Sequence, residues 1–314
     1  MISSNLIGVT QGRQHTPNVL LIGAGRFGKQ YIRILTRLEN EGELHFAGIV
    51  VGTEESKKLL SEVTSVSILV GFSHESLLGI DAVCIATPPE SHAAIAAQCL
   101  PYAHVFAEKP LALTEEECLS LGFLATEYDH ILMVGHIFRY TPLVAIAQSY
   151  FMDRELPMGV SGVFVNPTSA YTGRDPAFEL LHYFDIMDVL FGKLPEVEGV
   201  SGGGAMMTAQ LSYPDNVNAK FILGWRGEER VRWLEFFLPV GSLRLDFNDE
   251  SYELPGGAGK RYVSKQDREP LEQELRDFLR VIAGEQLEYV DAQKASRIIR
   301  IAKACSLQQN NIFE

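Results

Sequence analysis

The sequence has little of what membrane, nucleic-acid-binding or secreted proteins depend on. No run reaches the roughly 18 uninterrupted apolar residues that a membrane helix needs, so we expect no membrane partner. Acidic residues outnumber basic ones by 40 to 27, the formal net charge is −13, and no block of Lys or Arg stands out. A surface of that sign repels phosphate backbones, so we expect no nucleic-acid partner.

Cysteine is scarce as well. The chain has four, Cys84, Cys99, Cys118 and Cys305, without a Cys-x-x-Cys pair or a regular spacing. They lie in apolar stretches, where cysteine usually acts as a small core residue. We expect reduced, buried thiols in a cytoplasmic protein without a metal site; a catalytic cysteine or a metal site is the alternative. Residues 1–16 lack the features of a signal peptide, and we interpret them as a flexible extension.

The 314 residues suit two domains, and their composition is typical of a globular chain. In the first half, short apolar runs alternate with helical periodicity, which predicts a parallel sheet with helices on both faces. The expected strands are residues 18–22, 44–51, 67–70, 81–86, 104–107 and 131–134. Expected helices cover residues 27–38 and 93–100, and a capping box of Thr114 and Glu117 opens a third.

The second half has a different pattern. Alternating or aromatic-rich runs separated by turn residues predict a mostly antiparallel sheet. These runs are residues 160–165, 205–211, 219–224, 232–238 and 242–247. Two helices are expected to close the chain, at about residues 270–283 and 292–307. The change of pattern places a domain boundary near residues 135–139.

A glycine-rich turn follows the first expected strand. Its sequence, Gly-Ala-Gly-Arg-Phe-Gly, fits G-x-G-x-x-G and leads into a helix, the context in which this pattern predicts dinucleotide binding. The first glycine permits the tight turn, the second lets the backbone approach the pyrophosphate, and the third lets helix and strand pack closely. The free N–H groups at the start of the helix attract the phosphates. The predicted cofactor contacts here are Gly23, Gly25, Arg26, Phe27 and Gly28.

The second expected strand lacks the acid that normally binds the adenosine ribose. Gly52 and Thr53 stand at its end, and the first acids are Glu54 and Glu55. The missing acid removes a repulsion of the NADP 2′-phosphate, but no Arg stands beside it. We therefore predict Gly52 and Thr53 as cofactor contacts and NAD(P) as the cofactor, with a slight lean to NADP.

Three further motifs accompany the glycine turn. One is Thr-Pro-Pro-Glu-Ser-His after the fourth strand, one is Glu-Lys-Pro after the fifth, and one is His-Tyr-Phe-Asp at residues 182–185. Together these motifs resemble those of the Gfo/Idh/MocA family of sugar and cyclitol oxidoreductases, from about residue 18 to the C-terminal helices. Residues 134–142 are also similar to a segment of members that oxidise nucleotide-linked sugars.

The resemblance implies a fold and a set of functional residues. The fold is α/β, with a doubly wound parallel Rossmann sheet over residues 17–137. Residues 138–314 would form an α+β domain whose open, mostly antiparallel sheet binds substrate and forms homodimers or homotetramers. By resemblance, Lys109 matches the active-site lysine and His182 the proton-transferring histidine. The residues that match the cofactor side are Thr87, Pro88, His92, Glu108 and Lys109.

The sequence departs from the family pattern at one position. Many members carry an Asp four residues before the histidine, where this chain has Phe178; the nearest acid is Glu179. Asp185 follows His182 by one helical turn and is predicted to orient its ring if both face inward. The substrate is expected to be a small polyhydroxylated molecule, and the predicted contacts are Arg139, Tyr140, Tyr171, Arg174 and Tyr183.

Oxidation of an alcohol sends a hydride to nicotinamide and a proton to the protein. A neutral imidazole suits proton acceptance, which we assign to His182, and an ammonium stabilises alkoxide character, which we assign to Lys109. Lys109 with a lowered pKa is the alternative base. The predicted function is hydride transfer between NAD(P) and a secondary alcohol or ketone of a sugar, cyclitol or nucleotide-sugar. A catalytically silent nucleotide-binding sensor and a reductase of a non-sugar carbonyl are the alternatives.

Overall fold

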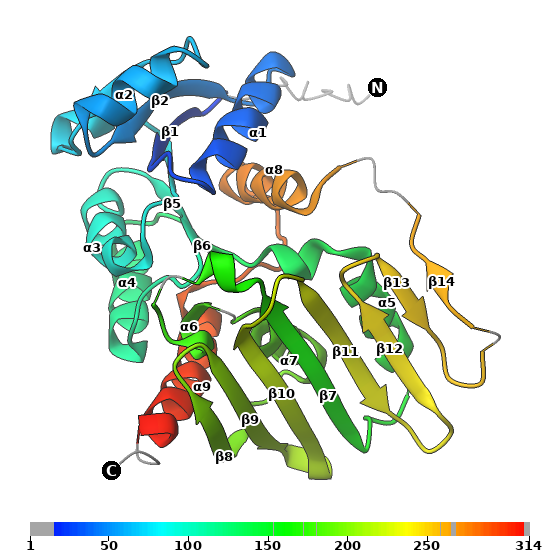
Figure 1. Cartoon of the computed structure of the whole chain (residues 1–314). Coiled ribbons are helices and arrows are strands. Elements are labelled where there is room, and N and C mark those ends of the chain that lie inside the picture. Colours follow the sequence, from blue (N-terminus) through cyan, green and yellow to red (C-terminus); the bar gives the residue numbers. More distant parts are fainter. Residues whose placement is uncertain are drawn as a thin grey trace, which may run out of the picture.

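Two sheets organise the two halves of the chain (Figure 1). The computed structural model describes residues 16–152, 154–171, 173–179, 181–257, 259–264 and 268–310. The predicted extension over residues 1–16 lies outside this range except for its last residue. None of the helices in the described ranges is long and apolar enough to cross a membrane.

The first sheet has six parallel strands in the order β3-β2-β1-β4-β5-β6. They are β1 (Asn18–Ile22), β2 (His45–Val51), β3 (Ile68–Val70), β4 (Ala82–Ile85), β5 (His104–Glu108) and β6 (Leu132–Gly135). This is the Rossmann order, in which the direction of winding reverses between β1 and β4 and opens a ligand crevice at their carboxyl ends. The predicted doubly wound sheet is confirmed.

Helices cover this sheet as its buried apolar strands require. They are α1 (Gly28–Asn40), α2 (Glu54–Ser61), α3 (Pro89–Cys99) and α4 (Glu115–Glu127), with the short helix η1 (His74–Leu77). Helix α1 packs one apolar stripe, including Tyr31, Ile34 and Leu38, against the strands. Helix α4 begins at the predicted capping box, because the Thr114 side chain accepts a hydrogen bond from the Glu117 N–H at 3.1 Å.

The second sheet has eight strands in the order β14-β13-β12-β11-β7-β10-β9-β8. They are β7 (Gly159–Asn166), β8 (Glu196–Gly203), β9 (Met206–Tyr213), β10 (Val217–Trp225), β11 (Val231–Phe237), β12 (Ser242–Asp246), β13 (Ser251–Glu253) and β14 (Arg261–Tyr262). Only the pair β7 and β10 is parallel among these described strands, so the predicted mostly antiparallel sheet is confirmed. Strand β8 was not predicted, because its glycines are typical of a loop.

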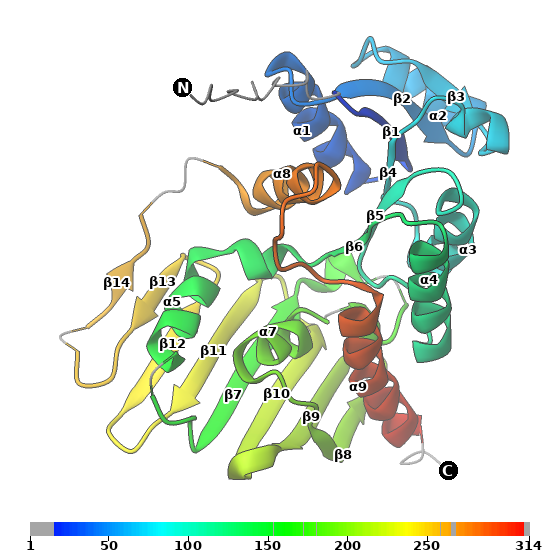
Figure 2. The ribbon, with the colours of Figure 1, turned by 180° about the vertical axis from the view of Figure 1, so that it is seen from behind.

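Helices lie on one face of the second sheet (Figure 2). They are α5 (Pro142–Phe151), α7 (His182–Phe191) and α9 (Ala292–Asn310). Short helical segments connect the strands and helices, namely η2 (Ile137–Tyr140), η3 (Thr168–Ala170), α6 (Pro176–Glu179) and η4 (Pro214–Asn216). Phe184 and Met187 of α7 are fully buried in the core between helices and sheet, with Phe221 of β10. This core fixes the start of α7, where His182 lies.

Helix α8 (Pro270–Ile282) follows the second sheet in the chain but packs against the first (Figure 1). Leu271, Leu275 and Phe278 are buried in the same core as β1 and α1. The range 138–314 stays a prediction as a domain, but α8 within it belongs by packing to the Rossmann core. The chain therefore crosses between the two halves more than once.

All four cysteines are buried free thiols, as predicted. Burial raises the pKa of Cys99 to about 12 and raises that of Cys84 further. These thiols are protonated at neutral pH, which makes them poor nucleophiles and poor metal ligands.

Candidate active site between the two sheets

A cavity of about 610 Å³ lies where the carboxyl ends of β4, β5 and β6 meet the second sheet at β7, β10 and β11. Predicted site residues from both halves of the chain line it. These are Arg26, Phe27, Thr87, His92, Glu108, Lys109 and His182. Tertiary folding therefore brings several predicted cofactor residues and the predicted acid–base residues to one cavity, whereas Gly52, Thr53 and Pro88 do not line it.

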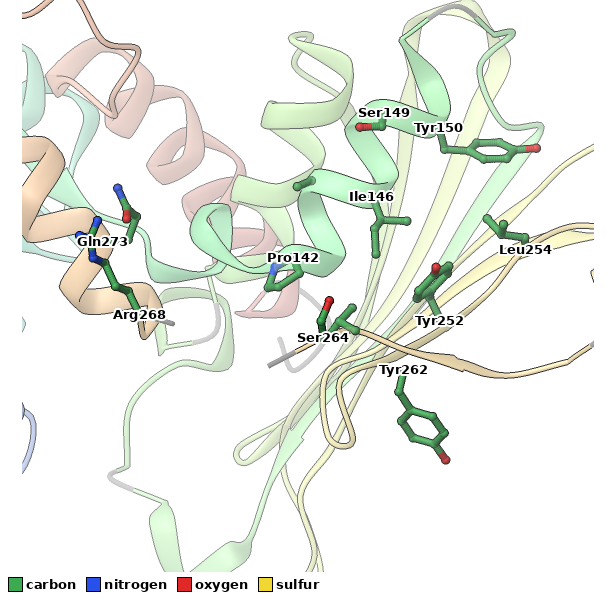
Figure 3. A pocket seen from close by; sticks show the side chains of 12 residues that line it. Pro142, Ile146, Ser149, Tyr150, Tyr252, Leu254, Tyr262, Ser264, Arg268 and Gln273 are labelled. Carbon is green, nitrogen blue, oxygen red and sulfur yellow. The ribbon is translucent and has the colours of Figure 1, made fainter. Parts of the chain in front are cut away.

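A larger hollow of about 1130 Å³ lies between α5 and the arm formed by β13 and β14 (Figure 3). Tyr150, Tyr252 and Leu254 line it, and Arg268 is the one charged side chain among its described lining residues. It contains none of the predicted site residues. The smaller cavity is therefore the candidate active site.

The glycine turn fits a dinucleotide. A Cβ at Gly23, whose φ is +98°, would lie 2.6 Å from the Ala86 carbonyl oxygen, and a Cβ at Gly28 would lie 2.5 Å from the Gly23 oxygen. A Cβ at Gly25 would meet no atom within 4 Å. The protein's own packing thus requires Gly23 and Gly28, whereas Gly25 faces the open space that a pyrophosphate would fill. The first turn of α1 carries no acid, which favours an anion there.

His92 joins the two motifs that border the cavity. It is 1% exposed, and its Nδ1 and Nε2 lie 2.7 Å from the Pro110 carbonyl oxygen and 2.8 Å from that of Thr87. Both ring nitrogens are therefore occupied by backbone. His92 holds the loop after β4 against the Lys109–Pro110 turn after β5, and the Lys109–Pro110 peptide bond is cis.

Glu108 lines the cavity, but it is turned toward α1. Its Oε1 accepts a hydrogen bond of 2.5 Å from the Tyr31 hydroxyl, and its Oε2 accepts one of 3.2 Å from the Lys109 N–H. Burial raises the pKa of Glu108 to about 7, although Tyr31 and Lys109 both favour the carboxylate. This carboxyl group therefore titrates near neutral pH.

His182 begins α7 and packs its ring against Phe138 and Phe164, with centroids 4.4 and 5.4 Å away. Burial lowers the pKa of His182 well below its usual range, and the positive charges of Lys109 and Arg232 lower it further. The imidazole is therefore neutral and able to accept a proton. Its Nδ1 is buried without a hydrogen-bond partner among the described residues.

Residues 17–136 match the model of the oxidoreductase family with an NAD-binding Rossmann fold, Gfo/Idh/MocA. Within the chain, these residues are similar to the Gfo/Idh/MocA family. Over these residues the predicted resemblance and the predicted oxidoreductase class are confirmed.

The similarity to known proteins extends over both halves of the chain. UDP-N-acetylglucosamine 3-dehydrogenase of Acidithiobacillus ferrooxidans is 26% identical over 304 residues, 90% of this chain and 94% of the relative. The 2,7-anhydro-N-acetylneuraminate hydratase of Escherichia coli is 22% identical over 287 residues, 80% of this chain and 74% of the relative. A solved structure of the Acidithiobacillus enzyme, 22% identical, has a TM-score of 0.84 and covers 96% of this chain and 100% of that one. Myo-inositol 2-dehydrogenase of Lactobacillus plantarum, 19% identical, has a TM-score of 0.80 and covers 95% and 98%. These structures confirm the fold.

The predicted ribose end of the cofactor site carries no acid at the end of β2. Gly52 is exposed there, and Thr53 is the N-cap of α2, where its hydroxyl oxygen accepts a hydrogen bond from the Ser56 N–H at 3.1 Å. Glu54 and Glu55 lie in the first turn of α2. Pro88, another predicted cofactor contact, precedes α3 as its N-cap residue.

Asp185 does not orient His182, and this prediction was wrong. The Asp185 carboxylate is fully buried and accepts hydrogen bonds from Arg139, with the Nη2 atom at 2.6 Å, while His136 Nδ1 lies at 3.5 Å. Burial raises the pKa of Asp185, but His136 and Arg139 outweigh it and leave that pKa lowered. Arg139 is likewise committed to Asp185 and Asp188, so its prediction as a substrate contact is corrected. Both residues join η2 to α7.

Tyr183 is a core residue rather than a substrate contact. It is fully buried, and its hydroxyl lies 2.6 Å from the Val163 carbonyl oxygen and 2.7 Å from that of Trp233. Tyr140 does not line the cavity either, because it packs against the core of the first sheet. The prediction for Tyr183 was wrong because neighbouring residues of a helix point in different directions. The prediction for Tyr140 was wrong because its ring packs toward the first sheet.

The two other predicted substrate contacts lie near the rim. Arg174 is within 3.1 Å of Glu90 at the start of α3. Tyr171 packs on Trp225, a lining residue, with centroids 5.1 Å apart. Neither side chain lines the cavity, so their role as substrate contacts stays a prediction.

The second sheet contributes lining residues that the sequence did not indicate. They are Phe164, Asn166, Trp225, Arg230 and Arg232. In the sequence they belong to strands or their ends, where they form no motif. Only the pairing of β7 with β10 and β11 brings them to the cavity.

Proposed function

We propose that this protein transfers a hydride between NAD(P) and a secondary alcohol or ketone of a sugar, cyclitol or nucleotide-sugar. The observation that carries this proposal is the convergence of the glycine turn, Lys109 and His182 on one cavity. The names of the relatives, which include a nucleotide-sugar dehydrogenase and a cyclitol dehydrogenase, support a polyhydroxylated substrate.

The residues of this chain have distinct parts in the reaction. The Gly25 backbone and the N–H groups at the start of α1 would hold the pyrophosphate, with Thr87 and Lys109 toward the nicotinamide. When bound, the nicotinamide supplies the hydride acceptor or donor. His182, held neutral by its surroundings, takes the hydroxyl proton, and the Lys109 ammonium stabilises negative charge on the same oxygen. Lys109 as base is the alternative, which a neutral His182 disfavours.

The structure weakens one of the competing functions. A reductase of a non-sugar carbonyl would use the aromatic pair beside His182, Tyr183 and Phe184, to contact its substrate. Both side chains are fully buried, so neither offers a surface for such a substrate. A nucleotide-binding sensor remains the second candidate, because Phe178 replaces the usual acid.

Nucleotide binding and turnover test the proposal together. NADH and NADPH are titrated by fluorescence into the wild type and Lys109→Ala, and sugars, cyclitols and UDP-sugars are then added with oxidised or reduced nucleotide. We expect saturable binding and a substrate-dependent change in reduced-nicotinamide signal, which Lys109→Ala abolishes. Binding without turnover on any panel would favour the sensor. Failure to bind either nucleotide would refute the proposal.

The role of His182 as the base has its own readout. We expect His182→Gln to lower kcat by roughly 10²- to 10⁴-fold, as loss of a general base does. The acidic limb of the wild-type kcat/KM profile should lie below the usual histidine pKa, because the pKa of His182 is lowered. His45→Gln, at an exposed histidine outside the cavity, is the matched control.

We also propose that the face of the second sheet without helices forms the homodimer or homotetramer interface. In the described chain that face is turned to the viewer in Figure 1, opposite α5, α7 and α9. Light scattering on the eluting protein measures the mass in solution, and a mass of one chain at micromolar concentration would refute this assembly.

A further inference from the structure

Arg232 lies on the face of β11 that packs into the core, where a strand normally carries apolar residues. Successive residues of β11 alternate between the two faces of the sheet. Arg232, Leu234 and Phe236 therefore share a face, and Leu234 and Phe236 are fully buried in the core. Arg232 is the member of this row that reaches the candidate active site.

The guanidinium of Arg232 is held in place without an acid. Its Nη2 donates to the Asn166 Oδ1 at 2.6 Å, and its Cζ lies 4.2 Å from the centre of the Phe164 ring. Its Nε is buried and has no hydrogen-bond partner in the described parts of the chain. No carboxylate of the described residues forms an ion pair with it. Asn166 and Phe164 thus fix its direction and leave its charge uncompensated.

The other largely buried arginines of the described chain are paired. Arg139 lies 2.6 Å from Asp185, and Arg276 lies 2.9 Å from Glu272. Those pairs follow the general rule that a buried charge is compensated by a partner. In a chain with 40 acidic residues, an unpaired Arg232 indicates that its partner arrives with a ligand.

The surroundings of Arg232 add positive charge. Arg230 lies exposed at the same cavity, and burial followed by the charge of Arg230 lowers the pKa of Arg232 to about 10, which leaves it protonated at neutral pH. The one acid that lines the cavity within the described residues is Glu108, whose carboxylate accepts a hydrogen bond from the Tyr31 hydroxyl. The cavity is therefore positively charged although the protein as a whole is acidic, and this positive charge favours anionic ligands.

Arg232 lies on the substrate side of the cavity. The glycine turn and Arg26, which suit the pyrophosphate, belong to the first half of the chain, whereas Arg232 belongs to the second sheet. Arg232 and His182 both pack against Phe138 and Phe164, and the charge of Arg232 acts on the His182 ring. A group bound by Arg232 is therefore close to the substrate carbon that would react beside His182 and Lys109.

We propose that the substrate carries an anionic group, a carboxylate or a phosphate, and that the Arg232 guanidinium binds this group while the reacting carbon lies beside Lys109 and His182. This inference rests on the proposed function and narrows its substrate class to acidic or phosphorylated sugars, nucleotide-sugars included. The planar guanidinium suits both groups because it presents parallel N–H donors to two oxygens. Asn166 positions the guanidinium, and Arg230 attracts the anion to the cavity.

Calorimetric titration of three probes tests the inference without any turnover. N-acetylneuraminate carries a carboxylate, UDP-N-acetylglucosamine a diphosphate, and N-acetylglucosamine no charge. We expect the wild type to prefer one anionic probe over the neutral one, and Arg232→Gln to weaken that probe roughly 10- to 100-fold, the effect of losing hydrogen bonds to a charged group. Arg232→Lys should weaken it less, because it keeps the charge but not the paired donors.

Arg244→Gln is the matched control. Arg244 is on the same sheet and lies over an aromatic ring, with its Cζ 4.3 Å from the centre of Trp233, but it is paired with Glu235 at 3.1 Å and does not line the cavity. Its substitution should leave all three affinities and NADH binding unchanged. Whichever anionic probe responds to Arg232→Gln identifies the group, carboxylate or phosphate.

Equal affinity of the wild type for neutral and anionic probes would overturn the inference, and so would unchanged anion affinity in a folded Arg232→Gln protein. If Arg232→Gln does not fold, the comparison of probes on the wild type and on Arg232→Lys decides in the same way. Turnover of a neutral polyol that is unchanged in Arg232→Gln would refute the inference and leave the proposed function standing. Anion binding through Arg232 without nucleotide binding would refute only the proposed function.

Discussion

Replacing Asp185 measures how much the buried polar network between η2 and α7 contributes to the stability of the fold. The carboxylate is fully buried, its oxygen lies 2.6 Å from Arg139, and His136 Nδ1 is 3.5 Å away. Asp185→Ala leaves the Arg139 guanidinium in the interior with Asp188, at 3.5 Å, as its remaining ion-pair partner among the described residues. Removing one partner of a buried ion pair costs about 3–5 kcal/mol. We expect a loss of unfolding free energy of that size.

Thermal unfolding provides the assay. For a domain of roughly 150–250 residues, each kcal/mol lowers Tm by about 2–4 °C, so Asp185→Ala should lower Tm by roughly 6–20 °C. The control is Lys193→Ala, which removes an exposed ion pair with Asp215 and should cost less than about 1 kcal/mol. A Tm loss for Asp185→Ala no larger than that of the control would refute the reasoning. Replacing both partners, as Arg139→Met with Asp185→Leu, should recover much of the loss, because an apolar pair of similar size leaves no unpaired charge.

The pH dependence of this effect has a defined sign. The pKa of Asp185 is lowered in the folded protein, since His136 and Arg139 outweigh burial. The stability that its charge contributes is therefore present above the unfolded pKa of about 3.9 and is lost as the pH falls through the lower folded value. The difference in stability between the wild type and Asp185→Ala should shrink accordingly in acid.

Two further predictions concern the cofactor half. Gly25→Ala should leave Tm unchanged but weaken NADH binding by about tenfold or more, because the added methyl group enters the open space that the pyrophosphate would fill. Gly23→Ala should instead lower the free energy of unfolding by about 1–3 kcal/mol, because its methyl group overlaps the Ala86 carbonyl. Equal effects of the two substitutions on NADH binding and on Tm would contradict this prediction. The raised pKa of Glu108, about 7, means that the folded protein keeps a proton that the unfolded chain releases. The free energy of unfolding of the wild type, measured in urea, should therefore fall by about 1.4 kcal/mol per pH unit relative to that of Glu108→Gln as the pH rises from about 4.5 toward 7. Parallel pH profiles of unfolding free energy for the two proteins would refute the raised pKa of Glu108.

The sequence determined the first sheet and its glycine turn because their signals are local. A strand buried on both faces is apolar throughout, and a turn that needs a positive φ needs glycine, as at Gly23. The motif residues that border the cavity, such as His92 and Lys109, were identified from short runs at strand ends. Parallel strands place their carboxyl ends at one edge, so these runs converge once the strand order is known.

Only the tertiary structure decided which side chains face the cavity and which face the core. Tyr183 and Asp185 follow His182 by one and three residues, yet their helical positions turn them to the sheet and to Arg139. Helix α8 packs against the first sheet although it follows the second, and Arg232 reaches the site through strand pairing alone. Sequence patterns report the periodicity of a segment, whereas the partner of a buried face or charge is chosen by contacts between residues that are distant in the chain.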